Sequence, residues 1–228
     1  VEIINKEELE RLPQGLTILP GTVWDLSGYY NGDGKTKLEI GSFTVMSHHG
    51  WVNLDIHDLS QFAQTHNYRF QGCDIKQGIP YQTGSVHMIH MSHVLEHFNQ
   101  TDGLSILREL RRIIRPDGVI RIAVPDAGLL INKCQTDPNS LAEFDEINDG
   151  CTSSPTRVGK LWELLFSGHQ MLYDRETLYL ALKETGFIPK SCQFRETTCG
   201  EFGEQILKET LDVLPCLSLF CEAVPQLS

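Results

Sequence analysis

Short apolar runs alternate with segments of helical pattern along most of this chain, and the alternation limits the fold more than any other feature of the sequence. The runs occupy residues 38–40, 52–54, 68–73, 86–92 and 119–124. Strands joined through helices usually pair in parallel, because each helix carries the chain back to the edge where the next strand starts. The 228 residues suit one large domain. The pattern therefore predicts an α/β domain with a mainly parallel sheet and helices on its faces.

Two helices can be placed by the residues at their ends. Residues 102–114 are expected to form a helix, because Leu107, Leu110 and Ile114 share one face of it. The Pro-Asp-Gly triplet at 116–118 is expected to stop this helix and turn the chain into the next strand. Residues 175–185 form the second helix, since Asp174 is a favourable N-cap and Gly186 can end a helix in the left-handed conformation.

Three other parts complete the expected organisation. Residues 1–36 have the pattern of a helical lead-in, so the main domain is expected to cover residues 37–228. Polar turns interrupt two helical patches within residues 127–170, which predicts an insertion folded over the strand ends as a lid. Apolar runs at 191–194 and 218–224 supply two more strands, and the second is expected to close the edge of the sheet.

The balance of charge excludes some classes of partner. Asp and Glu number 30 against 19 Lys and Arg, and the formal net charge of -11 repels phosphate backbones, which argues against a nucleic-acid partner. Seven cysteines, odd in number and without a CxxC pair, are typical of reduced thiols. No apolar run is long enough to span a membrane, and the first residues lack the apolar core of a signal peptide. These features predict a cytoplasmic protein that acts on a small molecule, without a membrane partner.

Residues 38–55 carry the strongest indication of a ligand site. A buried-looking strand runs directly into Gly41, and the following strand ends in the acid Asp55. In an open α/β sheet this arrangement puts a tight turn and a carboxylate at the same edge, where nucleotide-like ligands bind. The stretch therefore predicts a nucleotide-like cofactor site.

Six motifs follow one another in an order that resembles a known family. They are LEIGS, GWVNLDI, CDIKQGIPY, SHVLEHF, LRRIIRPDGVIRIAVPD and GHQMLYDRETLYLALKETGF, within about residues 37–224. In this order they resemble the class I S-adenosylmethionine-dependent methyltransferases, especially the small type 11-like branch. The resemblance implies a Rossmann-like fold with a seven-stranded, mostly parallel sheet whose last strand is antiparallel, and S-adenosylmethionine as the cofactor.

The resemblance also assigns residues to the cofactor. The loop after the first strand would lie against the methionine part, and the acid after the second strand would accept both ribose hydroxyls, which suits an acceptor-only carboxylate. The loop after the third strand would touch the adenine, and the end of the fourth strand would approach the sulfonium. The cofactor residues implied for this chain are Glu39, Gly41, Ser42, Asp55, Ile56, Asp74, Ile75 and Ser92.

Four polar residues are candidates for the reaction itself. His93 ends the fourth strand at the cofactor edge and is the first candidate for a catalytic base, because imidazole titrates near neutral pH, and His169 is the second. His97 and Asp126 are expected to bind the acceptor. The expected reaction moves a methyl group to oxygen or nitrogen of a small metabolite or sugar-like acceptor. In the alternative interpretation, His97 and Glu96 only cap or orient the loop that follows.

Phe43 marks a departure from the family pattern. Related enzymes have Gly-x-Gly after the first strand, whereas this chain has Gly41-Ser42-Phe43. A phenylalanine resists positive φ, and its ring can block a close approach to the backbone. A second function therefore stays open, a catalytically silent binding module that keeps the fold with an altered cofactor loop. A nicotinamide-dependent dehydrogenase ranks lower, because no GxGxxG follows the first strand.

The spacing of His93, Glu96 and His97 also raises the question of a metal ion. Some relatives that methylate quinone precursors or RNA ends hold a divalent ion with Glu-x-x-Glu-His at this place, and His169 is a candidate distant ligand here. Histidine in place of the first glutamate removes one negative charge from such a site. Neighbouring groups on a turn more often satisfy local hydrogen bonds, so the sequence predicts no metal.

Overall fold

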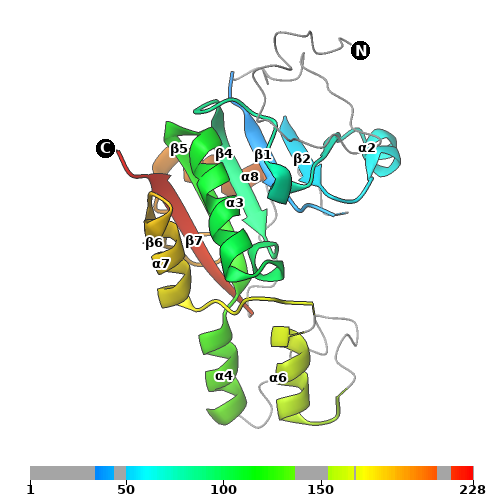
Figure 1. Cartoon of the computed structure of the whole chain (residues 1–228), viewed down its shortest axis with the longest axis vertical. Coiled ribbons are helices and arrows are strands. Elements are labelled where there is room, and N and C mark those ends of the chain that lie inside the picture. Colours follow the sequence, from blue (N-terminus) through cyan, green and yellow to red (C-terminus); the bar gives the residue numbers. More distant parts are fainter. Residues whose placement is uncertain (1–33, 44–49, 137–153, 167, 210–216, 228) are drawn as a thin grey trace.

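Seven strands form one sheet across the middle of the molecule (Figure 1), in the order β3-β2-β1-β4-β5-β7-β6. The computed structural model describes residues 34–43, 50–136, 154–166, 168–209 and 217–227. The strands are β1 (Lys37–Ile40), β2 (Trp51–Asp55), β3 (Arg69–Gly72), β4 (Val86–Ser92), β5 (Ile114–Pro125), β6 (Phe187–Ser191) and β7 (Ser218–Pro225). Strands β1 to β5 pair in parallel, and β7 is antiparallel to both neighbours. The predicted seven-stranded, mostly parallel Rossmann-like sheet is confirmed.

The far end of the sheet differs from expectation in two details. Strand β7 does not close the edge, because it pairs with β5 on one side and with β6 on the other. The strand expected at 191–194 lies earlier, at Phe187–Ser191. Gly186 adopts a φ of 84°, which lets the chain leave the preceding helix and enter the strand at once. The buried side chain of Phe187 then fixes the start of β6 against the core.

The Pro-Asp-Gly triplet at 116–118 lies within β5, not in a turn before it as predicted. Ile114 already pairs with Val86, and the ladder resumes where Val119 pairs with Met88. The residues between these two pairs leave the regular register as a bulge. A bulge accommodates a proline, which has no N–H to donate to the neighbouring strand.

Helices cover both faces of the sheet, as predicted. They are α2 (Ser60–His66), α3 (Gln100–Ile113), α4 (Ala127–Thr136), α6 (Arg157–Phe166), α7 (Arg175–Glu184) and α8 (Gly200–Glu209), with 3-10 turns η2 (Ile75–Gln77) and η3 (Leu95–His97). Helices α3 and α7 lie on one face and α8 on the other (Figure 1). Asp174 caps α7 as predicted, by accepting a hydrogen bond from the Thr177 amide. Among the described residues, none of these helices has both the length and the apolar composition needed to cross a membrane.

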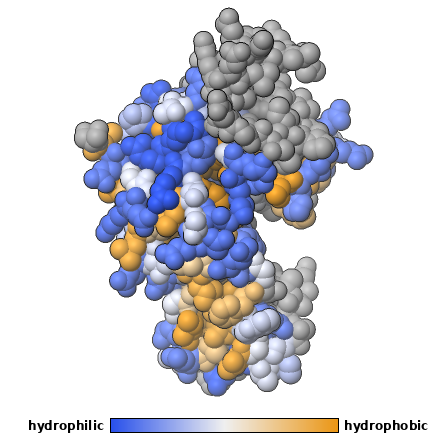
Figure 2. Space-filling model, in the orientation of Figure 1, coloured by the Kyte–Doolittle hydropathy of each residue, from blue (hydrophilic) through white to orange (hydrophobic). Residues whose placement is uncertain are grey.

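Helices α4 and α6 pack side by side beyond the carboxyl ends of the strands (Figure 1). They belong to the predicted insertion 127–170, of which residues 137–153 and 167 lie outside the described residues, as do residues 1–33 of the predicted lead-in. Figure 2 shows apolar side chains gathered over this part of the surface. The exposed apolar side chains on the two helices are Ile131, Val158, Trp162 and Phe166. A lid function for this unit stays a prediction.

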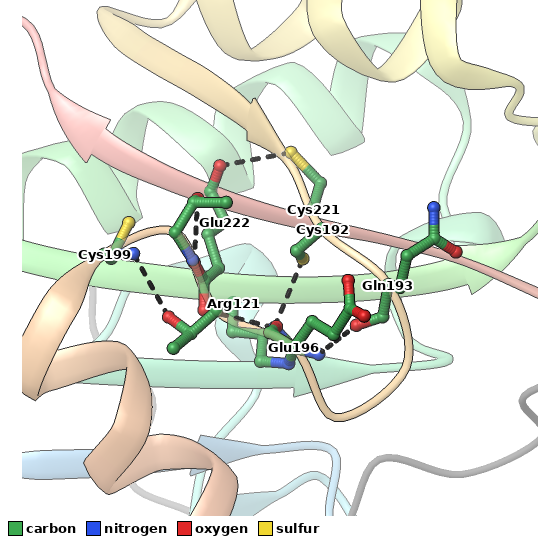
Figure 3. A network of polar contacts seen from close by, with 9 residues as sticks. Arg121, Cys192, Gln193, Glu196, Cys199, Cys221 and Glu222 are labelled. Carbon is green, nitrogen blue, oxygen red and sulfur yellow. Dashed lines mark hydrogen bonds and ion pairs between the residues drawn. The ribbon is translucent and has the colours of Figure 1, made fainter.

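A buried ion pair joins β5 to β7 (Figure 3). Arg121 Nη1 donates to Glu222 Oε1 at 3.1 Å, and both side chains have no exposed surface. The same guanidinium donates to the carbonyl oxygens of Gln193 and Glu196, and Glu222 Oε2 accepts from the Thr198 amide at 2.7 Å. The pair therefore fixes the segment that follows β6 to strands β5 and β7.

Burial makes two cysteines poor nucleophiles. Desolvation raises the pKa of Cys73 and that of Cys221 to about 12 in each case. Since the thiolate is the reactive form, we expect neither residue to react with iodoacetamide at pH ~8 in the native protein, and both to react after unfolding in urea. Mass spectrometry of the alkylated peptides measures this. Rapid alkylation of Cys73 or Cys221 in the native protein would contradict the buried placement.

Candidate active site

The carboxyl ends of β1, β2 and β4 bring the predicted cofactor residues to one edge of the sheet. Ile40 pairs with Leu54 of β2 and with Met91 of β4, so the residues that follow these three lie side by side at the carboxyl edge of the sheet. Those residues are Gly41, Asp55 and Ser92. Parallel strands end together in this way at the edge where ligands of open α/β sheets bind. The convergence predicted from residues 38–55 is therefore present in the fold.

Asp55 holds together the two loops on either side of it. Its Oδ2 accepts from the Phe43 amide at 2.9 Å, and its Oδ1 accepts from the His57 amide at 2.9 Å. The residue is 7% exposed. A carboxylate has about four lone-pair sites, so each oxygen keeps room for one more donor. The arrangement can accept two hydroxyl groups of a diol while it fixes the loops that surround them.

Phe43 adopts the backbone conformation that the sequence argument expected it to resist. Its φ is 43°, in the left-handed region, which costs an L-residue about 1–2 kcal/mol. The hydrogen bond from its own amide to Asp55 offsets this cost. The side chain is 57% exposed, with its ring centroid 6.0 Å from that of His57 in an edge-to-face contact. An exposed ring does not fill the space beneath the loop, which removes one argument for a silent site.

Gly41 lies where the structure leaves little room for a side chain. Its φ is 69°, and a Cβ added there would overlap Val94 Cγ2. Gly41→Ala should therefore lower the free energy of unfolding by about 2–4 kcal/mol, through left-handed strain and overpacking together. Gly84→Ala is the matched control, because Gly84 has a φ of 65° and nothing within 4 Å of an added Cβ. Equal losses for the two variants in urea denaturation would show that Val94 does not crowd Gly41.

The other predicted cofactor residues have varied surroundings. Glu39 is buried and lies beside His90, whose Nδ1 is 2.7 Å from Oε1 and 2.9 Å from Oε2. Asp74 caps η2 by accepting from the Lys76 amide at 3.1 Å and from the Gln77 side-chain amide at 2.9 Å. Ile75 is buried in the hydrophobic core, and Ile56 is exposed. Glu39 thus has a structural partner of its own, which the sequence did not indicate.

Two serine hydroxyls test whether this edge suits a polar ligand. Within the described part of the chain, the Oγ atoms of Ser42 and Ser92 are buried and have no hydrogen-bond partner. Buried hydroxyls are rarely left unsatisfied, because each such group forfeits its hydrogen bonds to water. Both serines belong to the predicted cofactor set. Their unsatisfied hydroxyls therefore fit a polar ligand that would lie along Gly41 and the end of β4.

His93 is held between two partners at the end of β4. Its Nε2 lies 2.8 Å from Ser218 Oγ at the start of β7, and its Nδ1 lies 3.3 Å from Glu96 Oε1. The backbone φ of His93 is 55°, which turns the chain sharply as it leaves the strand. A carboxylate beside one ring nitrogen and a hydroxyl beside the other fix the orientation of an imidazole. His93 therefore has the surroundings of a base, and Ser218 is a neighbour that the sequence analysis missed.

The motif that contains His169 docks directly on the motif that contains His97. The backbone amides of Gln170 and Met171 both donate to the Glu96 carbonyl oxygen, at 2.8 and 3.1 Å. The side-chain amide of Gln170 donates to the His97 carbonyl oxygen at 2.8 Å. The rings of His97 and His169 then lie with their centroids 4.9 Å apart. Two candidates that are far apart in the sequence are thus brought together.

Burial shifts two titratable groups near this junction. Desolvation lowers the pKa of His169 below its ordinary value, against an opposing effect of the Glu96 charge. Desolvation also raises the pKa of Tyr173 to about 12, and Glu96 adds to that shift. The neutral forms of both side chains are therefore favoured at neutral pH.

Asp126 immediately precedes α4, and its backbone amide donates to the carbonyl oxygen of Leu217, the residue before Ser218. Its Oδ1 accepts from the Leu129 amide at 2.9 Å, so the side chain caps the helix. Its backbone forms an isolated parallel bridge with Tyr173. The structure gives Asp126 a capping role, and its predicted contact with an acceptor stays a prediction.

The sequence was compared with models of protein families and with curated protein sequences. A family model described as a methyltransferase domain matches residues 30–189. Comparison with curated protein sequences finds no match.

Solved structures of low sequence identity share the fold. The citrinin polyketide synthase CMeT domain has a TM-score of 0.50 and 13% identity, over 85% of this chain and 47% of that chain, so this chain spans about half of its length. The PH0226 protein from Pyrococcus horikoshii has a TM-score of 0.51 and 14% identity, over 88% of this chain and 86% of that chain. A chain from a Haloferax volcanii complex with a methyltransferase activator has a TM-score of 0.51 and 14% identity, over 97% of this chain and 88% of that chain.

The family match covers more than half of the chain and includes the strands that carry Gly41, Asp55 and Ser92. The seven strands and the antiparallel last strand agree with the fold that the sequence motifs implied. The chain therefore belongs to the methyltransferase domain family and has the class I fold of S-adenosylmethionine-dependent methyltransferases.

Proposed function

We propose that this protein transfers a methyl group from S-adenosylmethionine to oxygen or nitrogen of a small metabolite or sugar-like acceptor. The observation that carries the proposal is the convergence of Gly41, Asp55 and Ser92 on one sheet edge, within the region matched by the methyltransferase family model. The unsatisfied hydroxyls of Ser42 and Ser92 support it, because they leave hydrogen-bonding capacity for a polar ligand at that edge.

Each part of this edge suits one part of the cofactor. The Asp55 carboxylate would accept the ribose hydroxyls, and the loop at Gly41 and Ser42 would lie along the methionine part. The segment at Asp74 and Ile75 would contact the adenine. When bound, S-adenosylmethionine supplies a methyl group from a positively charged sulfur, which becomes a neutral thioether as the acceptor's lone pair forms the new bond.

His93 is the proposed base. Its Nε2 would take the proton that the acceptor loses, while Glu96 beside Nδ1 stabilises the imidazolium that forms. Ser218, which lies against Nε2, would hold the ring or pass the proton to it. His97 lies on the adjacent turn η3 and His169 on the segment docked against it, where both would contact the acceptor.

The acceptor is proposed as a small molecule or a saccharide, not a nucleic acid or a membrane lipid. The net charge of -11 disfavours a polyanionic partner. The described cysteines are free thiols, which supports a reducing compartment such as the cytoplasm.

Methyl transfer can be measured with S-adenosylmethionine labelled in the methyl group and a fractionated extract of small molecules. The account expects label in a low-molecular-weight product, and it expects His93→Gln to slow transfer by about 100-fold or more. Affinity for S-adenosylhomocysteine should remain within about threefold in that variant, since His93 is not in the proposed cofactor set. Tight binding of S-adenosylhomocysteine without any labelled product would favour the silent binding module instead.

A further inference from the structure

Three potential metal ligands meet where the two docked motifs join. Glu96, His97 and His169 each offer one ligand atom, and these atoms all lie within 4.8 Å of one another. Glu96 and His97 belong to η3, and His169 belongs to the segment before α7. The hydrogen bonds from Gln170 to the carbonyl oxygens of Glu96 and His97 fix these two segments together. The spacing of the three side chains therefore depends on a braced backbone, as a preformed ligand site requires.

Each of the two histidine rings has its Nδ1 atom beside a backbone carbonyl oxygen. His97 Nδ1 lies 3.1 Å from the Gly168 carbonyl oxygen, and His169 Nδ1 lies 3.1 Å from the Leu165 carbonyl oxygen. A carbonyl oxygen only accepts, so Nδ1 carries the proton in each ring. In the neutral ring, Nε2 then keeps its lone pair. Histidines that bind metals usually have their second nitrogen fixed by such a carbonyl oxygen, which sets the tautomer and the ring orientation.

The carboxylate of Glu96 lacks the hydrogen bonds that its burial calls for. The residue is 1% exposed, and no donor among the described residues makes a hydrogen bond to either oxygen. The His93 ring lies beside it, with Nδ1 3.3 Å from Oε1. Burying an ionised carboxylate without such donors costs several kcal/mol, roughly, unless a cation compensates. Within the described parts of the chain Oε2 has no hydrogen-bond partner, so it remains for a further positive group.

We propose that Glu96, His97 and His169 bind a divalent transition-metal ion. Two imidazole nitrogens and one carboxylate oxygen favour Zn²⁺ or a neighbouring first-row ion over Ca²⁺ or Mg²⁺, which prefer all-oxygen sites. Three protein ligands leave at least one coordination position for another molecule. This proposal replaces the expectation of no metal. Local hydrogen bonds, the reason for that expectation, involve the Nδ1 atoms and leave the Nε2 atoms for the ion.

The position of the ion also suggests its role, which rests on the proposed function. His93 touches Glu96, so the ion would lie next to the proposed base. An acceptor hydroxyl on the open coordination position would have its pKa lowered and would lose its proton more readily. Metal binding itself does not depend on this role.

The direct test is titration of untagged, metal-free protein with Co²⁺, followed by absorption spectroscopy and calorimetry. The account predicts one Co²⁺ per chain, with visible d–d bands and without the near-ultraviolet band of thiolate ligation. Zn²⁺ should displace it. Glu96→Gln, His97→Ala and His169→Ala should each weaken Co²⁺ binding by at least about tenfold. His66→Ala is the matched control, because His66 also bonds through Nδ1 to a carbonyl oxygen one helical turn earlier, but lies outside the cluster.

Several results would overturn the proposal. They are the absence of saturable Co²⁺ binding, a thiolate band, or equal affinity in the three ligand variants and in His66→Ala. Circular dichroism of each variant establishes that it is folded, and Glu96→Gln preserves the shape of the one buried ligand. S-adenosylhomocysteine binding is measured separately on the metal-free protein. Its failure counts against the proposed function alone, whereas failure of Co²⁺ binding counts against the metal site alone.

Discussion

Replacing Asp55 with alanine is expected to weaken the binding of S-adenosylhomocysteine by at least about 100-fold, because two hydrogen bonds to a charged group are lost, each worth about 1.5–3 kcal/mol. The variant also removes the acceptor for the amides of Phe43 and His57, so the loops that surround the proposed ribose position lose their common anchor. Both effects act in the same direction. Isothermal titration calorimetry measures the affinity.

Asp58→Ala provides the control for this experiment. Asp58 is an exposed carboxylate three residues further on, and its Oδ1 accepts hydrogen bonds from the amide and the hydroxyl of Ser60. Hydrogen bonds from Ser60 lower the pKa of Asp58, so the control also removes a carboxylate that is charged at neutral pH. Its affinity for S-adenosylhomocysteine should stay close to that of the parent protein. An Asp55→Ala protein that unfolds cooperatively and binds as well as Asp58→Ala would show that the site is misplaced.

Glu222→Ala is expected to lower the free energy of unfolding by about 3–5 kcal/mol, because it leaves the Arg121 charge buried without its partner. The loss is large beside the total of about 5–15 kcal/mol that is typical of folded domains. Thr198 loses the acceptor for its amide in the same variant. Urea denaturation, with the midpoint and the slope both measured, gives the change.

The double variant Arg121→Met with Glu222→Leu separates the charge from the packing. It removes both charges and fills the space with apolar side chains, so it should cost less than either single replacement. Glu184→Ala is the surface control, because Glu184 pairs with Arg108 at 2.8 Å with both side chains more than half exposed. It should cost less than about 1 kcal/mol. A loss for Glu222→Ala no greater than that of Glu184→Ala would contradict a structural role for the buried pair.

The strands could be read from the sequence because each is a short apolar run bounded by polar residues or glycine. All five runs between residues 38 and 124 correspond to strands β1 to β5. The position of β7 could not be read in this way, because nothing local in its residues says that it enters the sheet between β5 and β6. Helix α8 was not predicted at all, since its residues follow a polar segment without a strong starting signal. The local sequence pattern therefore predicts where the strands lie in the chain, whereas pairing between distant segments decides their order in the sheet.

The candidate site shows the same division. Asp55 could be placed at the ligand edge, because it ends a parallel strand and ligands of open α/β sheets bind at the carboxyl ends of such strands. The left-handed Phe43 could not be predicted, since a hydrogen bond from its amide to Asp55 outweighs its local preference. The partner of His93 was equally hidden, because Ser218 lies 125 residues away in the chain. Contacts between distant segments decide which candidates meet, and they leave no local signal.

The most direct test of the account is calorimetric titration of the purified protein with S-adenosylhomocysteine. The account predicts saturable binding of one molecule per chain, and a crystal of the complex should place the ribose hydroxyls on the Asp55 carboxylate, with Ser42 and Ser92 within hydrogen-bond reach of the ligand. No heat of binding at millimolar ligand, for a protein shown to be folded, would contradict it.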